Sequence, residues 1–329
     1  MNETLVLTRS DVAALLGWGE CIAAVEEAFR LHGAGRSLSP GVLGVGAPDG
    51  GFHIKAAGLE LERLYFAAKT NANFPQNPRR NGRPAIQGVI VLCDATDGRL
   101  LALMDSMEVT LRRTAAATAV AAKYLARPDA RTALICGCGT QGRAQLRALA
   151  QVLPLERAAA FDVDSSCARS FARDLSSELG FEVHAADSLP RALEGADVCV
   201  TCTPSRSPLL FRGQIAPGTF VAAVGADSSE KQELDPLLMA ASVVVADVLD
   251  QCAAIGDLRH ALAAGAMTLD SVHGELADLV AGTRRGRTSK EQITIFDSTG
   301  TALEDVAAAV VVYRKALTAG VGLSVALGE

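Results

Sequence analysis

The segment TALICGCGTQG, residues 132–142, decides the fold of this 329-residue chain. Its first part is an apolar run of strand length, and its last six residues have the spacing Gly-x-Gly-x-x-Gly. A helical pattern over residues 143–152 follows, and the next apolar run leads to Asp162, twenty residues after Gly142. A strand, a glycine-rich turn, a helix and a later acidic residue, in this order, predict a dinucleotide-binding βαβ unit.

Each glycine of this turn has a physical reason. Gly137 allows the tight turn, Gly139 lets a pyrophosphate approach the backbone, and Gly142 lets the helix pack against the strand. Thr140 and Gln141 lie between these glycines and are predicted to bind the cofactor with them. The start of the helix offers unpaired N–H groups and a positive potential to the phosphates. A nucleotide-free α/β fold with a glycine-rich turn remains the alternative.

Asp162 indicates which dinucleotide is bound. Its carboxylate would accept hydrogen bonds from the ribose hydroxyls of adenosine and would repel a 2′-phosphate. No Arg or Lys follows it in residues 163–166. The sequence therefore favours NAD over NADP.

From residue 131 onward, apolar runs alternate with helical patterns. Apolar strands without a polar face, separated by helices, predict a doubly wound parallel sheet that is covered on both faces. Sites in such sheets lie at the carboxyl ends of the strands. We therefore expect four further residues at strand ends to line the cofactor: Thr203, Val224, Ser298 and Thr299. A local turn or cap explains each hydroxyl residue equally well.

The first hundred residues have a different pattern. A helical pattern over residues 10–32 precedes short strand-like runs that are rich in Gly and Pro and predict a β meander. A long Ala-rich helix over residues 109–126 follows, and a last helix over residues 301–318 is expected to pack on the N-terminal region. We expect a substrate-binding and dimerisation domain at 1–113, completed by 301–329, and a dinucleotide-binding domain at 114–300.

Composition excludes several classes of protein. Hydrophobic residues make up 49% and charged residues 21%, which argues against intrinsic disorder. A net charge of −6 argues against a nucleic-acid partner, and the absence of long apolar runs and of a signal-peptide pattern predicts a cytoplasmic protein without a membrane partner. The pairs Cys136/Cys138 and Cys199/Cys202 lie in apolar runs without a nearby His, so we expect buried thiols rather than a metal site.

Several motifs along the chain resemble one family. They are AAK (67–69), NFPQNP (73–78), IQG (86–88), TLRRTAA (110–116), VGAD (224–227) with KQEL (231–234), and FDSTG (296–300), together with the glycine-rich turn. In this combination the chain resembles the ornithine cyclodeaminase/μ-crystallin family over nearly its full length.

The resemblance implies a fold and a class of chemistry. The expected fold is α/β, with a Rossmann-type sheet and an α+β domain whose partly open β-barrel forms a homodimer. The active site would lie between the domains, and the chemistry would use nicotinamide at the α-carbon of an amino or imino acid.

Three residues acquire roles from these motifs. Lys69 would contact the substrate carboxylate or donate a proton, and Arg113, rather than Arg112, would bind the α-carboxylate bidentately. Asp227 would bind the substrate nitrogen and stabilise the iminium that accepts hydride. From the residues alone, Lys69 at the surface, Arg113 as ordinary surface charge and Asp227 as a helix cap stay open.

The segment around His53 and Lys55 departs from the cyclodeaminase branch, which has an acidic residue there for the distal amine of ornithine. Strand alternation places His53 and Lys55 on one face, and this basic face would repel a distal ammonium and favour an additional carboxylate or a neutral group. A solvated barrel face is the alternative.

These inferences favour an NAD(H)-dependent imine reductase or amino-acid dehydrogenase for a small 2-imino or 2-amino acid, similar to a ketimine reductase or an alanine dehydrogenase. One alternative is ornithine cyclodeaminase, which forms L-proline and ammonia with catalytic NAD. The other is a non-catalytic, crystallin-like ligand-binding dimer.

Overall fold

The computed structural model describes residues 3–327, which form two compact units. The first unit comprises the described residues up to Arg113 and those from Thr301 onward, and the second is Thr114–Gly300. The chain therefore leaves the first unit once and returns to it at the end.

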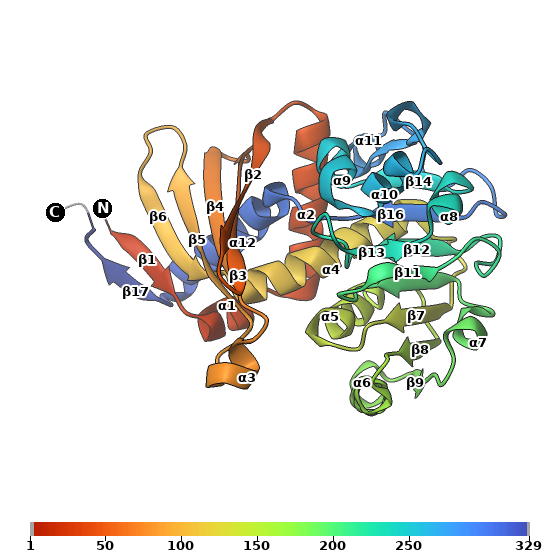
Figure 1. Cartoon of the computed structure of the whole chain (residues 1–329). Coiled ribbons are helices and arrows are strands. Elements are labelled where there is room, and N and C mark those ends of the chain that lie inside the picture. The colour runs from red at the N-terminus through yellow and green to blue at the C-terminus, as the bar shows by residue number, and fades with distance from the viewer. Residues whose placement is uncertain (1–2, 328–329) are drawn as a thin grey trace. The chain divides into compact units, whose positions relative to one another are not determined.

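A seven-stranded sheet forms the first unit, in the order β17-β1-β6-β5-β4-β3-β2 (Figure 1). Its neighbours are antiparallel except β1 and β6, which are parallel. The strands are β1 (Thr4–Leu7), β2 (Ser37–Ala47), β3 (Gly50–Glu60), β4 (Leu64–Asn73), β5 (Ile86–Asp94), β6 (Leu100–Asp105) and β17 (Leu323–Val325). Because β2 and β17 are the edge strands and do not pair with each other, the sheet stays open, as in the expected partly open barrel.

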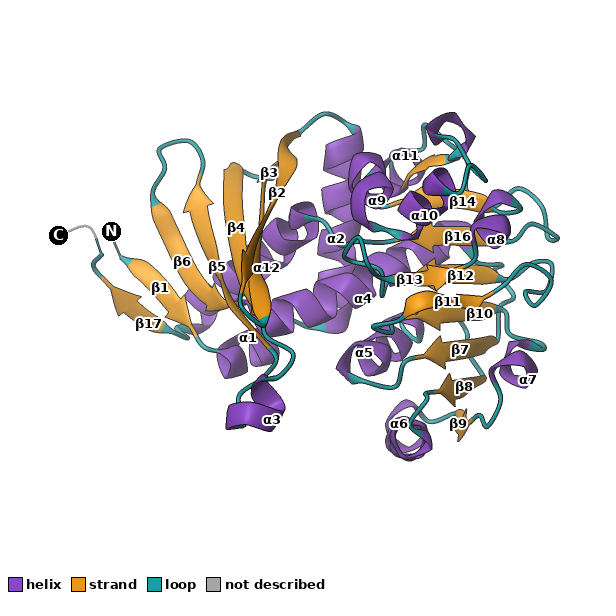
Figure 2. Cartoon of the chain, in the orientation of Figure 1, coloured by secondary structure: helices purple, strands orange, loops and turns teal. Residues whose placement is uncertain are grey.

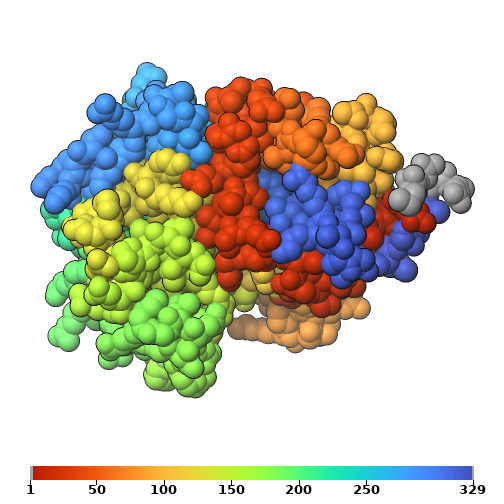
Figure 3. Space-filling view, turned by 180° about the vertical axis from the view of Figure 1, so that it is seen from behind, coloured from red at the N-terminus to blue at the C-terminus, as the bar shows by residue number. Residues whose placement is uncertain are grey.

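One helix covers the inner face of this sheet. It is α12 (Ala302–Ala319), which contacts β2 to β6 and buries an apolar surface that includes Val306, Val310 and Val312. Figure 3 shows α12 (blue) beside α2 (red), and the two helices are in contact. The other helices of the unit are α1 (Arg9–Leu15), α2 (Trp18–Gly33) and α3 (Asn77–Asn81), while α4 (Ser106–Leu125) begins in this unit and ends in the second.

The single helix predicted over residues 10–32 is wrong, because α1 ends at Leu15 and α2 begins at Trp18. Gly17 has an extended backbone, and its N–H donates to the Glu20 carboxylate at 3.2 Å. This bond is the half of a capping box that a glycine can form, and it starts a new helix in the middle of a continuous apolar pattern.

The second unit contains an eight-stranded parallel sheet in the order β15-β14-β16-β12-β10-β7-β8-β9. In Figure 2 its strands lie one above another. They are β7 (Thr132–Cys136), β8 (Arg157–Phe161), β9 (Glu182–Ala185), β10 (Val198–Thr201), β12 (Phe220–Ala223), β14 (Val243–Ala246), β15 (Gly274–Glu275) and β16 (Thr294–Asp297). The strand order reverses between β7 and β10, which is where doubly wound sheets bind ligands. The predicted parallel, doubly wound sheet is confirmed.

Helices and a small sheet complete this unit. The helices are α5 (Thr140–Leu149), α6 (Ser165–Leu179), α7 (Leu189–Leu193), α8 (Pro236–Ala240), α9 (Leu249–Ile255), α10 (Asp257–Ala263) and α11 (Leu276–Val280), with a 3₁₀ turn at Leu269–Ser271. The small sheet pairs β11 (Arg206–Leu210) with β13 (Gln232–Leu234). No helix within residues 3–327 has the length and apolar character that a bilayer crossing requires.

Candidate active site

The glycine-rich turn lies between β7 and α5, with Gly139 as the residue that caps the helix. Gly137 has φ +101°, and a Cβ there would lie 2.9 Å from the carbonyl oxygen of Cys202. A Cβ on Gly142 would collide with the carbonyl oxygen of Gly137, whereas a Cβ on Gly139 would meet nothing within 4 Å. The chain itself therefore requires the outer two glycines, and the open side of Gly139 leaves space for a ligand to reach the backbone.

Asp162 follows β8 and is joined to this turn. Its Oδ2 accepts a hydrogen bond from the Cys138 N–H at 2.8 Å, and its Oδ1 accepts one from the Asp164 N–H at 2.9 Å. Asp164 in turn caps α6 through the Ser166 N–H. The carboxylate thus has a fixed position beside the glycine-rich turn.

The strand ends of the second unit lie in register. Cys136 at the end of β7 pairs with Thr201 of β10, which pairs with Ala223 of β12, which pairs with Asp297 of β16. The residues that follow these ends therefore share one edge of the sheet with the glycine-rich turn. Those predicted to line a cofactor are Thr203, Val224, Ser298 and Thr299.

A buried carboxylate that the sequence analysis did not single out connects two of these strand ends. Glu233 on β13 accepts hydrogen bonds at Oε1 from the N–H and hydroxyl of Thr203, at 2.6 and 2.7 Å. Its Oε2 accepts from the Thr201 hydroxyl at 2.7 Å and the Gly225 N–H at 2.8 Å. Burial, and then the nearby Asp257 carboxylate, raise the pKa of Glu233 to about 7.

Three more buried carboxylates satisfy backbone groups around this edge. Asp257 Oδ1 accepts from the N–H groups of Glu233 and Leu234, and Asp297 Oδ2 accepts from the Leu258 N–H. Asp247 Oδ2 accepts the N–H groups that follow β16, including Gly300 at 2.6 Å. Asp257 thus stabilises strand β13, Asp297 the start of α10, and Asp247 the loop after β16.

The cysteines and other potential ligands form no metal site in the part of the chain that the structure describes. No group of three or more His, Cys, Asp or Glu side chains in residues 3–327 is arranged to hold a metal ion. Of the two cysteine pairs, Cys136, Cys138 and Cys199 are buried and Cys202 is half-buried, all as free thiols. Burial raises the pKa of Cys138 to about 12, so this thiol stays neutral.

Asp227 lies in the exposed loop between β12 and β13. Its carboxylate forms an ion pair with Lys231, with Nζ and Oδ1 2.6 Å apart, and its side chain is 55% exposed. The next element along the chain is strand β13, so the helix-cap alternative for Asp227 is wrong.

In the first unit, Lys69 and Arg113 are both buried. Lys69 on β4 is 3% exposed and Arg113 on α4 is 4% exposed, so neither is an ordinary surface charge. The neighbouring Arg112 instead lies over the Trp18 ring, donates to the Leu16 carbonyl and is paired with Glu108. The structure therefore places Arg113, rather than Arg112, in the interior with Lys69.

Two acidic residues at the start of α12 hold these cations. Lys69 Nζ lies 2.9 Å from Oδ1 and 2.8 Å from Oδ2 of Asp305. Arg113 Nε donates to Asp305 Oδ1, and Arg113 Nη1 donates to Glu304 Oε2, both at 2.9 Å. The result is a buried cluster from three elements, which we call the cation pair site: Lys69, Arg113, Glu304 and Asp305.

The surroundings of Lys69 in the cation pair site bring the pKa of its ammonium group close to neutral pH. Burial and then the charge of Arg113 lower the pKa of Lys69 to about 7, although Asp305 acts in the opposite direction. Burial also opposes the charge on Arg113, but the carboxylates of Asp305 and Glu304 outweigh it and raise the Arg113 pKa. Arg113 is therefore a permanent cation, whereas Lys69 is able to exchange a proton.

The basic residues of β3 lie on the same face as Lys69. Lys55 pairs in register with Lys69, and His53 pairs with Asn71, so His53 and Lys55 share one face, as strand alternation predicted. Lys55 is half-buried and its charge contributes to the lowered pKa of Lys69, whereas His53 is exposed. The structure therefore brings Lys55 to the cation pair site and leaves His53 near the open end of the strand.

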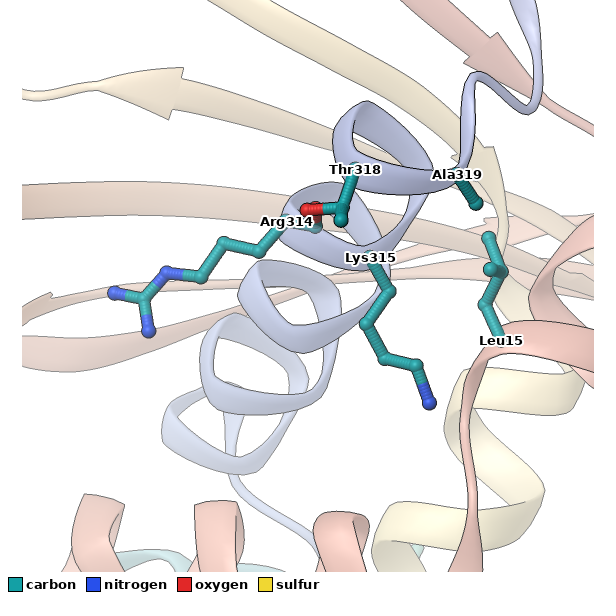
Figure 4. Close-up of a pocket in the computed structure, with 5 residues that line it drawn as sticks. All are labelled: Leu15, Arg314, Lys315, Thr318 and Ala319. Atoms are coloured by element: carbon teal, nitrogen blue, oxygen red, sulfur yellow. The ribbon is translucent and has the colours of Figure 1, made fainter.

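A surface groove of the first unit lies elsewhere. Figure 4 shows it beside the C-terminal end of α12, where it is lined by Leu15, Arg314, Lys315, Thr318 and Ala319. Asp305 is in the first turn of the same helix, and none of the predicted site residues lines the groove.

Comparison with known proteins identifies the family. The model of the ornithine cyclodeaminase/mu-crystallin family matches residues 2–320. The chain belongs to this family.

Members of this family are similar to the chain in sequence and structure. Alanine dehydrogenase of Archaeoglobus fulgidus is 37% identical over 321 residues, which are 97% of each chain. An archaeal alanine dehydrogenase dimer with bound NAD is 37% identical, with a TM-score of 0.93 over 98% of this chain and 99% of that one. Thermococcus litoralis Δ(1)-pyrroline-2-carboxylate reductase, in complex with NADH and L-proline, is 34% identical, with a TM-score of 0.93 over 98% of this chain and 100% of that one.

The family motifs contain Glu233, but the sequence analysis assigned no role to it or to Glu304 and Asp305. The signal for the last two was present, because an acidic pair precedes the apolar run that begins at Val306. Two adjacent carboxylates in a helix whose remaining sequence is mostly apolar require buried partners.

Proposed function

We propose that this chain is an NAD(H)-dependent imine reductase or amino-acid dehydrogenase that acts at the α-carbon of a small 2-imino or 2-amino acid. The observation that carries the proposal is the buried cation pair site, in which Lys69 and Arg113 share one carboxylate. A cationic pair with one proton-exchanging member suits an α-carboxylate beside a nitrogen that changes its protonation state. The similarity to an alanine dehydrogenase and to a pyrroline carboxylate reductase supports this class.

NAD is the proposed cofactor. The residues fit it, since the open side of Gly139 leaves room for a pyrophosphate at the start of α5 and Asp162 has a fixed carboxylate for ribose hydroxyls. Gly137, Gly142, Thr140 and Gln141 would complete the phosphate site. The cofactor, when bound, supplies or accepts the hydride.

In the proposed mechanism, Arg113 binds the substrate carboxylate and fixes the orientation of the α-carbon. Lys69 in its ammonium form binds the same carboxylate or donates a proton during imine reduction. Asp227, a carboxylate on a loop, binds the substrate nitrogen and stabilises the iminium, which is far more electrophilic than the neutral imine. Lys55 extends the positive charge along β3 toward the substrate side chain.

This charge distribution disfavours ornithine cyclodeamination. A distal ammonium that approached along β3 would meet Lys55, and His53 stands at the position where the sequence comparison expects an acid. The crystallin-like, non-catalytic alternative does not require a lysine that exchanges a proton near neutral pH, as the pKa of Lys69 indicates.

We also propose that the protein is a homodimer whose interface is the outer face of the first sheet. Leu43, Val45, Phe52 and Val89 are 39–56% exposed, and the strand register places them on the face opposite Lys69 and α12. A continuous exposed apolar face of this kind is typical of an interface. The related archaeal alanine dehydrogenase is described as a dimer.

The test is an NADH absorbance assay on a panel of substrates: pyruvate with ammonia, other 2-oxo acids with amines, and five- and six-membered cyclic ketimine carboxylates. We expect NADH oxidation with at least one, and slower oxidation of NADPH. Ammonia release from ornithine with catalytic NAD would establish the cyclodeaminase alternative instead. Tight NADH binding without turnover of any substrate would favour the crystallin-like alternative.

A further inference from the structure

Asp305 stands between the two cations of the first unit. It lies in the first turn of α12, is 1% exposed, and contacts Lys69 on β4 through both carboxylate oxygens. Its Oδ1 also accepts from Arg113 Nε on α4. One carboxylate thus links side chains from three elements that are far apart in the sequence.

Two buried cations require such a link. Lys69 and Arg113 repel each other, and burial removes the water that would otherwise screen them. An anion in contact with both offsets this repulsion and fixes the direction in which each side chain points. Without it, the ammonium would lose its proton more readily and both long side chains would regain rotamer freedom.

The ion pair that the structure describes for Lys69 is the one with Asp305, and the neighbours on the other elements are cationic, apolar or paired with Arg113. On β3 its register partner is the cation Lys55, and on β5 it is the apolar Ile90. On α4 the neighbour is Arg113, and on α12 Glu304 contacts Arg113. Among the described residues, Asp305 is therefore the anion that lies in ion-pair distance of Lys69.

We propose that Asp305 is a positioning residue for the proposed reaction: it holds the Lys69 ammonium and the Arg113 guanidinium side by side, so that one substrate carboxylate meets both, and it keeps Lys69 protonated at the pH of the reaction. This role rests on the proposed function. Asp305 acts through the two cations and need not touch the substrate.

Glu304 provides a matched control. It precedes Asp305 on the same helix, is also buried and also contacts Arg113. It additionally accepts the Thr301 N–H as part of the cap of α12. The two carboxylates therefore share burial and the Arg113 contact, whereas the described ion pair with Lys69 belongs to Asp305.

The experiment compares Asp305→Asn with Glu304→Gln through the pH profile of kcat/KM for imine reduction. If protonated Lys69 is required, activity falls as pH rises through its pKa, and loss of the Asp305 charge lowers that pKa. We expect the midpoint of the alkaline limb of Asp305→Asn to shift to lower pH by about one unit or more. We also expect kcat to be reduced about tenfold or more. We expect the limb of Glu304→Gln to stay within about 0.3 pH units of the wild type. Titration of the imine itself affects all variants equally, so the differences between them report the enzyme.

Asp305→Glu keeps the charge but moves it by one methylene, and it serves if Asp305→Asn fails to fold. This variant should keep the wild-type limb and lose kcat, because the charge remains while the geometry changes. NADH binding, measured by protein fluorescence, verifies that each variant has a folded second unit. An unmoved limb in Asp305→Asn, an equal shift in Glu304→Gln, or a shift in Asp305→Glu would overturn the role of Asp305.

Failure of the proposed function is distinguishable from failure of this inference. If the wild type turns over no substrate, the proposed function is wrong, and the inference is then tested by binding of pyrrole-2-carboxylate, a planar carboxylate that accepts no hydride. Calorimetry across pH 6–9 should show that the affinity for this carboxylate decreases as pH rises. The midpoint of this decrease should lie at a lower pH in Asp305→Asn than in the wild type. Identical pH dependence of binding in the two proteins would contradict the proposed role of Asp305, independently of the proposed function.

Discussion

Burial separates two adjacent arginines that the sequence presents as equals. Arg113 places Nε and Nη1 on the carboxylates of α12, whereas Arg112 stacks on Trp18 with its side chain 18% exposed. One helical step of about 100° between neighbours decides which of them reaches the interior.

This difference predicts unequal effects of the same conservative change. Arg113→Lys should lower kcat/KM by about 100-fold, because an ammonium cannot reproduce the planar fork that meets two carboxylates and a substrate. Arg112→Lys should stay within about threefold of the wild type, since a lysine at this position keeps the positive charge beside Glu108. Steady-state kinetics of both variants check the prediction, and equal losses would contradict the proposed role of Arg113.

At the scale of elements, Glu233 joins the loops after β10 and β12. A Cβ on Gly225 would lie 2.5 Å from the Glu233 carboxyl group, so the glycine and the glutamate fit each other. Through Thr203 and Gly225, this single side chain determines where two proposed cofactor-lining loops lie.

Glu233→Gln should therefore weaken cofactor binding. The amide NH₂ group would face a backbone N–H of Thr203 or Gly225, which leaves a buried donor unpaired at a cost of about 1–3 kcal/mol. We expect the Kd for NADH to rise about tenfold or more, measured by fluorescence titration. Glu230→Gln is the control, because Glu230 is exposed and paired only with the exposed Arg206 in the ion pairs of the described chain. Equal NADH affinity in Glu233→Gln and the wild type would contradict this role.

The elements also show which features of the fold and the site could be predicted from the sequence. The βαβ unit from β7 to Asp162 was predictable, because strand, turn and helix follow one another within about thirty residues and each obeys local rules. The position of Lys55 beside Lys69 was predictable only in part. Strand alternation predicts the face on which Lys55 lies, but the pairing of β3 with β4 determines that Lys69 is its neighbour. The contact between Lys69 and Asp305 was out of reach, because it joins residues 236 positions apart and depends on how α12 packs. The break at Gly17 was missed because apolar periodicity continues across it.

On the scale of the whole molecule, buried acids should make stability depend on pH in an unusual direction. Burial raises the pKa of Asp257 from 3.8 to about 6, and burial with the Asp257 charge raises that of Glu233 from 4.5 to about 7. The folded state then binds more protons than the unfolded state between about pH 4 and 7. The stability that these groups contribute is present at the acidic end of this window and is lost as pH rises through it.

Thermal denaturation tests this coupling. We expect the Tm of the wild type to fall between pH 5 and pH 7.5, and to fall less in Asp257→Asn, which keeps the Oδ1 acceptor and removes the titrating charge. Asp250→Asn, a change at an exposed residue of α9, should retain the wild-type slope. A Tm that rises steadily across this range, with the same slope in all three proteins, would contradict the coupling.

Assembly is the other property of the whole molecule. Leu43 on β2 and Leu237 on α8 are equally exposed, at 56% of each residue, but only Leu43 belongs to the apolar outer face of the first sheet. Leu43→Glu should convert the dimer to a monomer at micromolar concentration, because a charge cannot be buried unpaired in an apolar interface. Leu237→Glu should leave the mass unchanged in light scattering. A dimer that persists in Leu43→Glu would place the interface elsewhere.

The interrupted layout of the first unit also affects how the molecule is made. All residues of the second unit, Thr114–Gly300, are translated before α12, and domains generally fold as units in order of synthesis. A nascent chain that stops before Thr301 therefore contains every residue of the nucleotide-binding unit but lacks both anions that neutralise Lys69 and Arg113. Synthesis of α12 is thus the step at which the inner face of the first sheet gains its cover. Until then, the exposed apolar face of this sheet is a surface that a chaperone would bind.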